Sequence, residues 1–411
     1  MMTGGGGSGG DGPAYACEPF GNVVEILSKA DLNNTTEIDE EVIVSFDNQG
    51  YVHVFVTDNS ANQLVARTVR DDELGQLIKY PPMPGMGDVR TFGALTFGTS
   101  IQLAARVDND FQLLQFDKNG NELATNPPTL LNVPKPLACD PPAQQERLWA
   151  SFDEGDVYLL GTCTNNNVAT IFGSEVPGGT VNFQFSGNPS DPLYRPSQYV
   201  HAGANIIITS GENPSNPNYG AFVRVGDDAM IPMMQPIPIS LEQDKAAFPF
   251  ALVRANGNMP GVFALIASLT ADSPSLTPAT LYGGVVQGMD LPAFLMNQGG
   301  FLSPAIDFPN QSSILFVTPP NPAFGRYVSA GLNLFSAGPS QVSIQWWSPE
   351  GQLYTSSVIN EITDTMANGR HTYVAAGGGN QLFYYVVWAR QDADMQFVVE
   401  GTRVACDVVT P

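Results

Sequence analysis

A short hairpin pattern recurs along this chain of 411 residues and limits the possible folds more than any other feature. The clearest copy is LWASFDEGDVYLLGTC, residues 148–163, in which two strand-forming runs flank an acidic turn that contains glycine. Asp and Gly tolerate the backbone angles of a tight reversal, so this stretch predicts a β-hairpin. Residues 42–57 repeat the pattern, and the tripeptide SFD precedes the turn in both copies.

Similar turns occur throughout the chain and have centres near residues 47, 108, 153, 211, 257, 309 and 378. Their mean spacing is about 55 residues, and the segments between them are mostly strand-like. Repeats of about 40–55 residues with four short strands are typical of β-propeller blades. Each blade has two apolar faces that only neighbouring blades can cover, so the ring must close. We therefore expect an all-β propeller of about seven four-stranded blades, with seven favoured over six or eight.

The propeller prediction also implies a domain organisation. Residues 1–13 are expected to form a flexible tether rich in Gly and Ser, and residues 14–411 a single propeller domain. Residues 22–27 and 395–404 are the natural partners for closing the ring. Tandem β-sandwich domains are the alternative fold. A hairpin at residues 348–351 has no clear place in the repeat, and residues 358–366 could form a helix in a connection.

Four cysteines, Cys17, Cys139, Cys163 and Cys406, form an even and sparse set without CxxC spacing. This argues against zinc and redox motifs and favours two disulfides, for which three connectivities exist. We expect Cys139–Cys163 to brace the first hairpin and Cys17–Cys406 to join the chain ends. Such bonds indicate an oxidising compartment, namely the extracellular space, the cell surface or the periplasm. Four buried thiols in a cytosolic protein are the alternative.

The net charge limits the partners. Forty acidic residues against 17 basic ones give −23, and charged residues make up only 14% of the chain. A field of this sign repels phosphate backbones, which argues against nucleic acid and anionic membranes. Protein and glycan ligands remain open, and the charge also serves solubility. No apolar run reaches the length of a membrane span, so no transmembrane segment is expected.

The first 20 residues, MMTGGGGSGGDGPAYACEPF, contain no apolar core of a secretory signal. Residues 3–12 resemble the Gly/Ser tether that follows the lipidated cysteine of bacterial lipoproteins. That resemblance implies a lipid anchor in the native precursor, although the tethering cysteine is missing from this stretch.

Residues 151–158, SFDEGDVY, resemble the Asp-box of sialidases and related propellers, S-x-D-x-G-x-T-W in outline. They depart from it at the threonine and have Tyr158 in place of Trp. In that family the box is a structural turn, so the likeness implies a fold and not an activity. More broadly, the chain is similar to bacterial secreted and lipoprotein-type β-propeller repeat proteins, a resemblance at superfamily level that identifies no functional residues.

Asp117, Asn119 and Asn121 resemble the calcium loops of some propellers, D-x-[DN]-G-[DN]-G. Oxygen ligands at alternate positions suit a hard cation, so these residues are the metal candidates and calcium is the cofactor candidate. Glu122 replaces the second glycine of the loop, and an ordinary hairpin turn is the alternative.

Aromatic residues gather near the C-terminus, where Trp346, Trp347, Tyr384 and Trp388 are candidates for ligand binding. Aromatic rings stack on sugars and anchor protein interfaces. Core packing is the alternative, because neighbours in a strand face opposite ways and at least one of the two adjacent tryptophans should be core. The loop AMIPMMQPIPIS, residues 229–240, is either a blade connection or an exposed contact surface.

No catalytic constellation is evident. His53, His201 and His371 have no metal-ligand spacing, and the chain contains neither a nucleophile elbow nor a P-loop. We therefore expect a secreted or cell-surface, non-enzymatic binding or scaffold protein that recognises a protein or glycan through loops on one propeller face. The alternatives are a glycosidase-like carbohydrate-active enzyme and a structural subunit of an extracellular assembly. The oligomeric state stays open.

Overall fold

The structure of the protein is a computed structural model. It describes residues 14–36, 38, 42–47, 49–58, 60–80, 89–97, 99–108, 110–140, 143–153, 156–176, 179–203, 205–211, 221–239, 246–254, 261–269, 278–287, 303–307, 313–317, 320–321, 326–334, 340–349, 352–362, 371–377 and 383–409. The expected tether at residues 1–13 lies outside these ranges.

The described residues form seven antiparallel sheets and no α-helix. In the first four sheets the strands follow chain order, apart from β10 and β11, which both pair with β9. The strands of these four sheets are β3 (Ile43–Phe46), β4 (Val52–Asp58), β5 (Gln63–Arg70) and β6 (Glu73–Tyr80); β7 (Val89–Phe97), β8 (Ser100–Val107), β9 (Asp110–Asn119), β10 (Glu122–Leu123) and β11 (Thr129–Asn132); β12 (Gln144–Asp153), β13 (Asp156–Asn165), β14 (Val168–Val176) and β15 (Thr180–Gly187); and β16 (Pro196–Ala202), β17 (Asn205–Gly211), β18 (Ala221–Gly226) and β19 (Ile237–Pro238).

The other three sheets hold the C-terminal part of the chain and both N-terminal strands. Two short 3-10 turns, η1 (Leu137–Cys139) and η2 (Pro192–Tyr194), lie in connections. The strands are β20 (Ala246–Arg254), β21 (Gly261–Leu269), β22 (Pro278–Gln287) and β23 (Ser303–Asp307); β24 (Ser313–Val317), β25 (Pro320–Asn321), β26 (Arg326–Leu334), β27 (Ser340–Trp347) and β28 (Leu353–Ile362); and β29 (His371–Gly377), β30 (Phe383–Gln391), β31 (Phe397–Val409), β1 (Ala14–Pro19) and β2 (Val24–Leu27).

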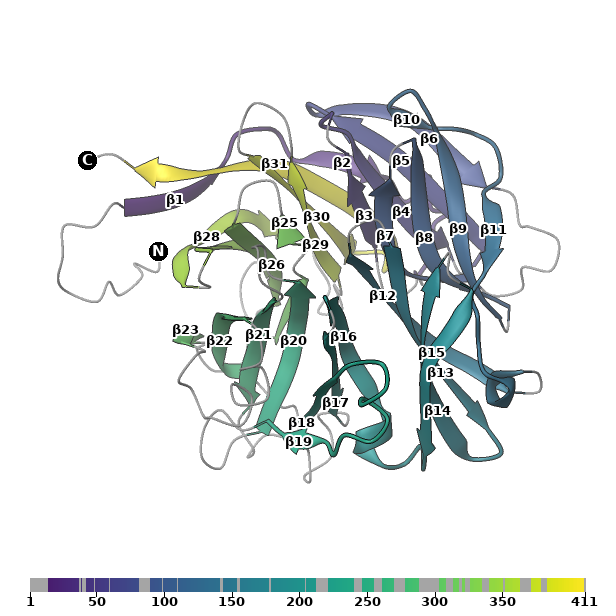
Figure 1. The fold of residues 1–411 in the computed structure, drawn as a ribbon. Coiled ribbons are helices and arrows are strands. Elements are labelled where there is room, and N and C mark those ends of the chain that lie inside the picture. Colours follow the sequence, from purple (N-terminus) through teal and green to yellow (C-terminus); the bar gives the residue numbers. More distant parts are fainter. Residues whose placement is uncertain are drawn as a thin grey trace.

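The sheets are arranged as a closed ring. The first strand of each sheet contacts the first strand of the next, from β3 through β7, β12, β16, β20 and β24 to β29, and β29 contacts β3 again. In Figure 1 the chain colour runs once around this ring, and the yellow β31 meets the purple β1 and β2. The architecture is a β-propeller of seven blades, as the sequence predicted, and the tandem-sandwich alternative does not hold.

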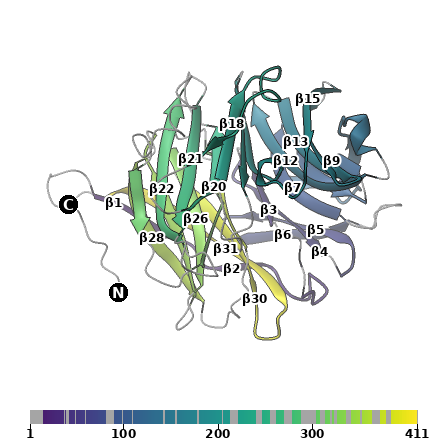
Figure 2. The same cartoon turned by 90° about the horizontal axis from the view of Figure 1, so that it is seen from below.

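The N-terminal strands complete the seventh blade. β31 pairs with β1 along one part of its length and with β2 along another, in place of a fourth strand from the same end of the chain. Cys17 lies opposite Cys406 in the β1–β31 ladder, and the two form a disulfide. Figure 2 shows β1 and β31 extending together from the ring. The expected closure is therefore present, and so is the expected Cys139–Cys163 bond.

The apolar core is divided among the seams between blades. We number the blades in chain order, from the sheet of β3–β6 as the first to the sheet of β29–β31 as the seventh. Six clusters of buried side chains fill the seams between blades 1 and 2, 2 and 3, 3 and 4, 4 and 5, 6 and 7, and 7 and 1. The first four blades and the seventh therefore pack on both faces, which explains why their strands are apolar almost continuously: β4 is buried at all seven of its positions. Because the strands of a blade are antiparallel, the turns after its first and third strands lie on one side of the ring. We call this side face A.

Two local expectations are corrected. Residues 358–362 belong to strand β28 and not to a helix, in keeping with the β-branched residues there, and residues 363–366 lie outside the described part. The turns used to estimate the repeat are not equivalent, since the one near residue 108 joins the second and third strands of its blade and the one near 309 falls between blades. The hairpin expected at residues 348–351 falls between the paired strands β27 and β28, and its residues 350–351 lie outside the described part.

Candidate functional site

A hollow on face A lies at the seam between the third and fourth blades. Its centre is a face-to-face stack of Tyr158, near the start of β13, and His201, near the end of β16. Their ring centroids are 3.6 Å apart and their planes differ by 3°. Ser151 joins the two blades beneath this stack, because the backbone N–H of His201 donates a hydrogen bond to Ser151 Oγ over 3.0 Å. The serine of the Asp-box-like segment thus joins two blades.

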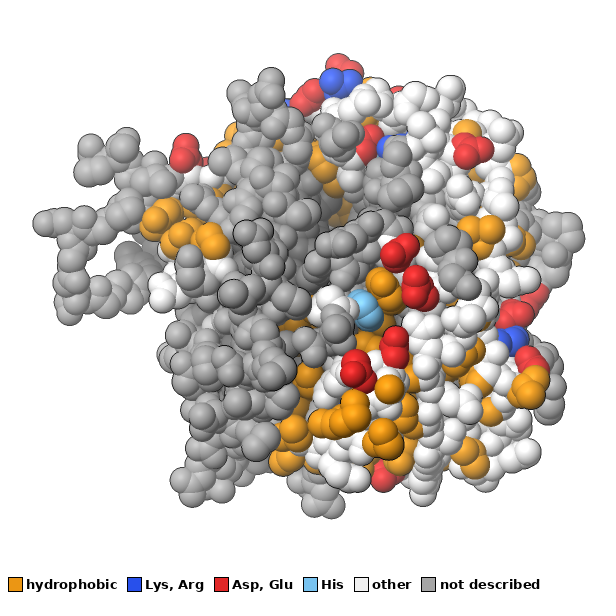
Figure 3. Space-filling model, in the orientation of Figure 1, with side chains coloured by type: hydrophobic (Ala, Val, Ile, Leu, Met, Phe, Trp, Pro, Cys, Tyr) orange, Lys and Arg blue, Asp and Glu red, His pale blue; other side chains and the backbone are white. Residues whose placement is uncertain are grey.

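Three carboxylates surround this stack. Glu175 belongs to β14 of the third blade, whereas Asp227 and Asp228 follow β18 of the fourth. With Gly203 and Ala229 these side chains enclose about 380 Å³. Figure 3 shows acidic side chains around a histidine on this side of the molecule.

The charges in the hollow are set by their surroundings. Burial lowers the pKa of His201, while Asp228 and Glu175 act in the opposite direction. Partial burial raises the pKa of Asp228, opposed by His201 and by a hydrogen bond with Asn182 but supported by the neighbouring Asp227. At neutral pH the hollow therefore combines an uncharged imidazole with carboxylates, and its potential is negative.

An apolar loop borders the hollow. Asp227 accepts a hydrogen bond from the backbone N–H of Met230 through Oδ1, at 2.8 Å, which fixes the start of the loop. Ile231 is buried, whereas Met230 and Met233 are 47% and 68% exposed. Figure 3 shows hydrophobic side chains next to the acidic ones on this face. The methionine-rich segment thus connects β18 to β19 within one blade and leaves two methionine side chains exposed.

The aromatic candidates near the C-terminus do not form a binding surface in this structure. Trp346, Trp347, Tyr384 and Trp388 are at most 1% exposed. The Trp346 indole N–H donates to the Tyr384 hydroxyl over 2.8 Å, and that of Trp388 donates to Glu400 at the same distance. Their positions correspond to the core-packing alternative, and both adjacent tryptophans are buried because both faces of a blade are covered.

The calcium-loop candidates lie in a regular hairpin. Asn119 pairs with Glu122 across the two-residue turn that joins β9 to β10, and Gly120 has a φ of 66°. Asp117 belongs to β9, where it pairs with Ser100. No group of three His, Cys, Asp or Glu side chains suited to a metal ion occurs among the described residues.

A second buried polar group lies in the first blade, near its seam with the second. Asp47 accepts hydrogen bonds from the backbone N–H groups of Gln49 and Tyr51, at 2.9 and 3.0 Å. His53 contacts Asp47 through Nε2 at 3.4 Å, and Lys118 of the second blade lies 3.8 Å from the same carboxylate. The three side chains are at most 5% exposed. This network holds a turn of face A and joins two blades.

We expect the protein to lose stability below about pH 6.5. Burial is the largest cause that lowers the pKa of both His53 and His201, despite the opposing carboxylates of Asp47, Glu122, Asp228 and Glu175; Lys118 adds to the lowering at His53. The unfolded chain therefore takes up these protons at higher pH than the folded protein, and the free energy of unfolding falls as pH decreases through this range. Urea unfolding at about pH 7.5 and about pH 5.5 measures this, and His53→Gln should flatten the dependence. Equal midpoints at the two pH values would contradict the expectation.

The sequence did not reveal the residues of the hollow. Asp227 and Asp228 are visible as an acidic pair after a strand, but nothing local relates them to Tyr158 or Glu175. His201 has no ligand spacing in the sequence that would single it out.

His371, the third histidine, lies in β29. The described residues include no helix long and apolar enough to span a membrane.

The fold thus defines the class: a seven-bladed β-propeller whose last blade is completed by the N-terminal strands. No known family model matches the chain, and no curated protein sequence does.

Among solved structures the chain is similar to the Dos1 propeller, with 11% identity, a TM-score of 0.46 and coverage of 94% of this chain and 95% of that one. A protein of unknown function from Dyadobacter fermentans DSM 18053 has 11% identity, a TM-score of 0.47 and coverage of 95% and 99%. The polysaccharide lyase Uly1 has 10% identity, a TM-score of 0.47 and coverage of 89% of each chain. These values give no information on activity, and the assignment to the propeller class rests on the sheet topology.

Proposed function

We propose that the protein is a non-enzymatic binding module of an oxidising compartment, outside the cell or at its surface, and that it captures a basic segment of a partner protein on face A. The observation that carries this proposal is the hollow at the seam of blades three and four, where carboxylates surround an aromatic stack. A lysine or arginine side chain fits such a site, because the carboxylates attract it and can accept its hydrogen bonds.

The apolar loop next to the hollow favours a peptide over a small cation. Met230 and Met233 are exposed within a few residues of Asp227 and Asp228, and flexible methionine side chains adapt to varied apolar partners. A segment with a basic residue flanked by apolar residues would satisfy both parts of the surface. The overall charge of −23 adds long-range attraction for such a partner.

A random-peptide display library selected on the purified protein tests this proposal. We expect the recovered peptides to carry Lys or Arg beside apolar residues. Their binding should weaken by about tenfold or more in the variant Glu175→Gln/Asp227→Asn/Asp228→Asn, and it should weaken with added salt. The matched control is Glu18→Gln/Glu146→Gln/Glu361→Gln, which removes three exposed carboxylates elsewhere. Peptides without basic residues, or equal binding by both variants, would overturn the proposal.

A carbohydrate-active enzyme is the second candidate, and one observation favours it. The raised pKa of Asp228 in the neighbourhood of other carboxylates is the property that a general acid requires. Incubation with a panel of polysaccharides, followed by measurement of new reducing ends, separates the candidates. The binding module releases none, whereas release that disappears with Asp228→Asn would replace the proposal with catalysis.

A further inference from the structure

An irregularity in the first blade opens a second site, far along the ring from the hollow described above. Between β5 and β6, Arg67 pairs with Leu77 and Val69 pairs with Leu74, so Gly75 and Gln76 together oppose Thr68 alone. This is a β-bulge, a device that locally bends a strand and redirects side chains. A glycine inside a strand often marks such a bulge or a place where another group approaches the backbone closely.

The backbone of Gly75 lies close to its neighbours at the floor of the site. A Cβ atom there would lie 3.1 Å from the backbone oxygen of Thr68 and 3.3 Å from Glu122 Oε1. Two hollows meet at Glu122: one of about 330 Å³ that Gly75 lines and one of about 460 Å³ that Gln76 lines. The bulge thus faces a groove along the seam between the first and second blades.

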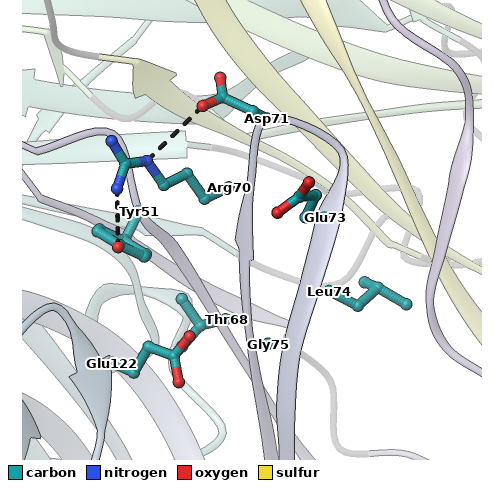
Figure 4. Close-up of a pocket in the computed structure, with 8 residues that line it drawn as sticks. All are labelled: Tyr51, Thr68, Arg70, Asp71, Glu73, Leu74, Gly75 and Glu122. Carbon is teal, nitrogen blue, oxygen red and sulfur yellow. Dashed lines mark hydrogen bonds and ion pairs between the residues drawn. The ribbon is translucent and has the colours of Figure 1, made fainter.

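Contacts within the protein fix several hydrogen-bonding groups of the groove before any ligand binds. The guanidinium of Arg70 donates to the Tyr51 hydroxyl over 2.8 Å and lies 4.8 Å above the centre of that ring. Asp71 Oδ2 lies 3.6 Å from Arg70 Nε. Figure 4 shows Arg70 and Tyr51 on one side of the hollow, with Thr68 and Glu122 beneath them and Glu73 beside the turn.

We infer that this groove binds a neutral oligosaccharide. Each sugar hydroxyl both donates and accepts hydrogen bonds, and the groove supplies acceptors on Glu73 and Glu122, donors on Arg70, and groups of both kinds on Gln76. Its volume suits one or two sugar rings. The carboxylates of Asp71, Glu73 and Glu122 outnumber the one guanidinium of the lining, that of Arg70. Lys118 is buried against Asp47 and does not offset them. The lining is therefore acidic, which disfavours a negatively charged sugar. The inference concerns different residues from the proposed peptide site and does not depend on it.

Saturation-transfer NMR with the full chain tests the inference. The probes are the neutral disaccharides maltose, cellobiose, lactose and xylobiose at about 10 mM, with a uronic-acid disaccharide and a glucosamine disaccharide as charged comparisons. At least one neutral probe should give a signal, and the uronic-acid probe should give less. Signals from none of the neutral probes, or a stronger signal from the uronic-acid disaccharide, would overturn the inference.

Two substitutions locate the site. Gly75→Ala would bring a methyl group within 3.1–3.3 Å of Thr68 and Glu122 and so displace the Glu122 carboxylate. Glu122→Gln keeps the shape while removing the charged acceptor. Each should weaken sugar binding by about tenfold. Gly93→Ala is the matched control, because its new Cβ would meet Ala150 Cβ at an ordinary 3.7 Å. If Gly75→Ala fails to fold, Glu122→Gln alone decides the question. Undiminished binding by Glu122→Gln would place the sugar elsewhere and refute the assignment.

Discussion

Replacing Cys17 and Cys406 together by alanine is expected to lower the free energy of unfolding by about 2–5 kcal/mol. The bond joins residues separated by 389 positions, so it restricts the unfolded chain far more than the Cys139–Cys163 bond, which spans 24. It also fixes β1 on β31, and β1 in turn covers the sixth blade, where the ring of Tyr15 stacks on Tyr354 with centroids 4.1 Å apart. Loss of the bond should therefore loosen the seam between the last two blades.

The matched control for this prediction is the double alanine variant of Cys139 and Cys163. All four sulfur-bearing side chains are buried to a similar degree, so the two variants differ mainly in the loop that each bond closes. Urea unfolding followed by tryptophan fluorescence compares them. The closure variant should be the less stable of the two by about 1 kcal/mol or more. An equal or smaller effect would mean that the bond contributes nothing to ring closure.

The second large effect is expected at Asp47. Asp47→Ala should cost about 3–5 kcal/mol, because it leaves the buried ammonium group of Lys118 without its partner carboxylate. It also removes the acceptor for two backbone N–H groups of the turn after β3. Asp47→Asn retains an oxygen for that turn and should cost less. Adding Lys118→Met to Asp47→Asn should recover part of the loss, since it removes the unpaired charge.

A surface ion pair provides the comparison for Asp47. Asp394 is 70% exposed and lies 3.2 Å from Lys29, so Asp394→Ala should cost no more than about 1 kcal/mol. Chemical denaturation of the four variants at neutral pH gives the measurement. If Asp47→Ala costs as little as Asp394→Ala, the buried network does not hold the first two blades together.

The fold was predictable from the sequence because its units are local. A hairpin is encoded by two short strand-forming runs and the turn between them, and the pattern around residues 153–156 gives the paired strands β12 and β13. Closure was predictable for a different reason, since only a strand from the other end of the chain can complete the last blade. The positions of turns within each blade were less certain, because the turns before and after a given strand have similar composition.

The candidate site was not predictable because it is built across blades. Tyr158 and His201 meet only when two sheets pack side by side. Nothing in the sequence shows how the residues of one blade line up with those of the next. The aromatic residues near the C-terminus also show that packing between blades could not be predicted. Trp346 packs in the seam between the sixth and seventh blades, whereas Trp347 faces Gly283 of the fifth blade, so two neighbouring rings that point opposite ways are both core.

Peptide mapping under non-reducing conditions tests the closed ring most directly. A proteolytic digest of the unreduced protein should yield one peptide pair containing Cys17 and Cys406 and another containing Cys139 and Cys163, with no free thiol. Cys17 recovered as a free thiol, or bonded to Cys139 or Cys163, would show that the N-terminal strand does not complete the seventh blade.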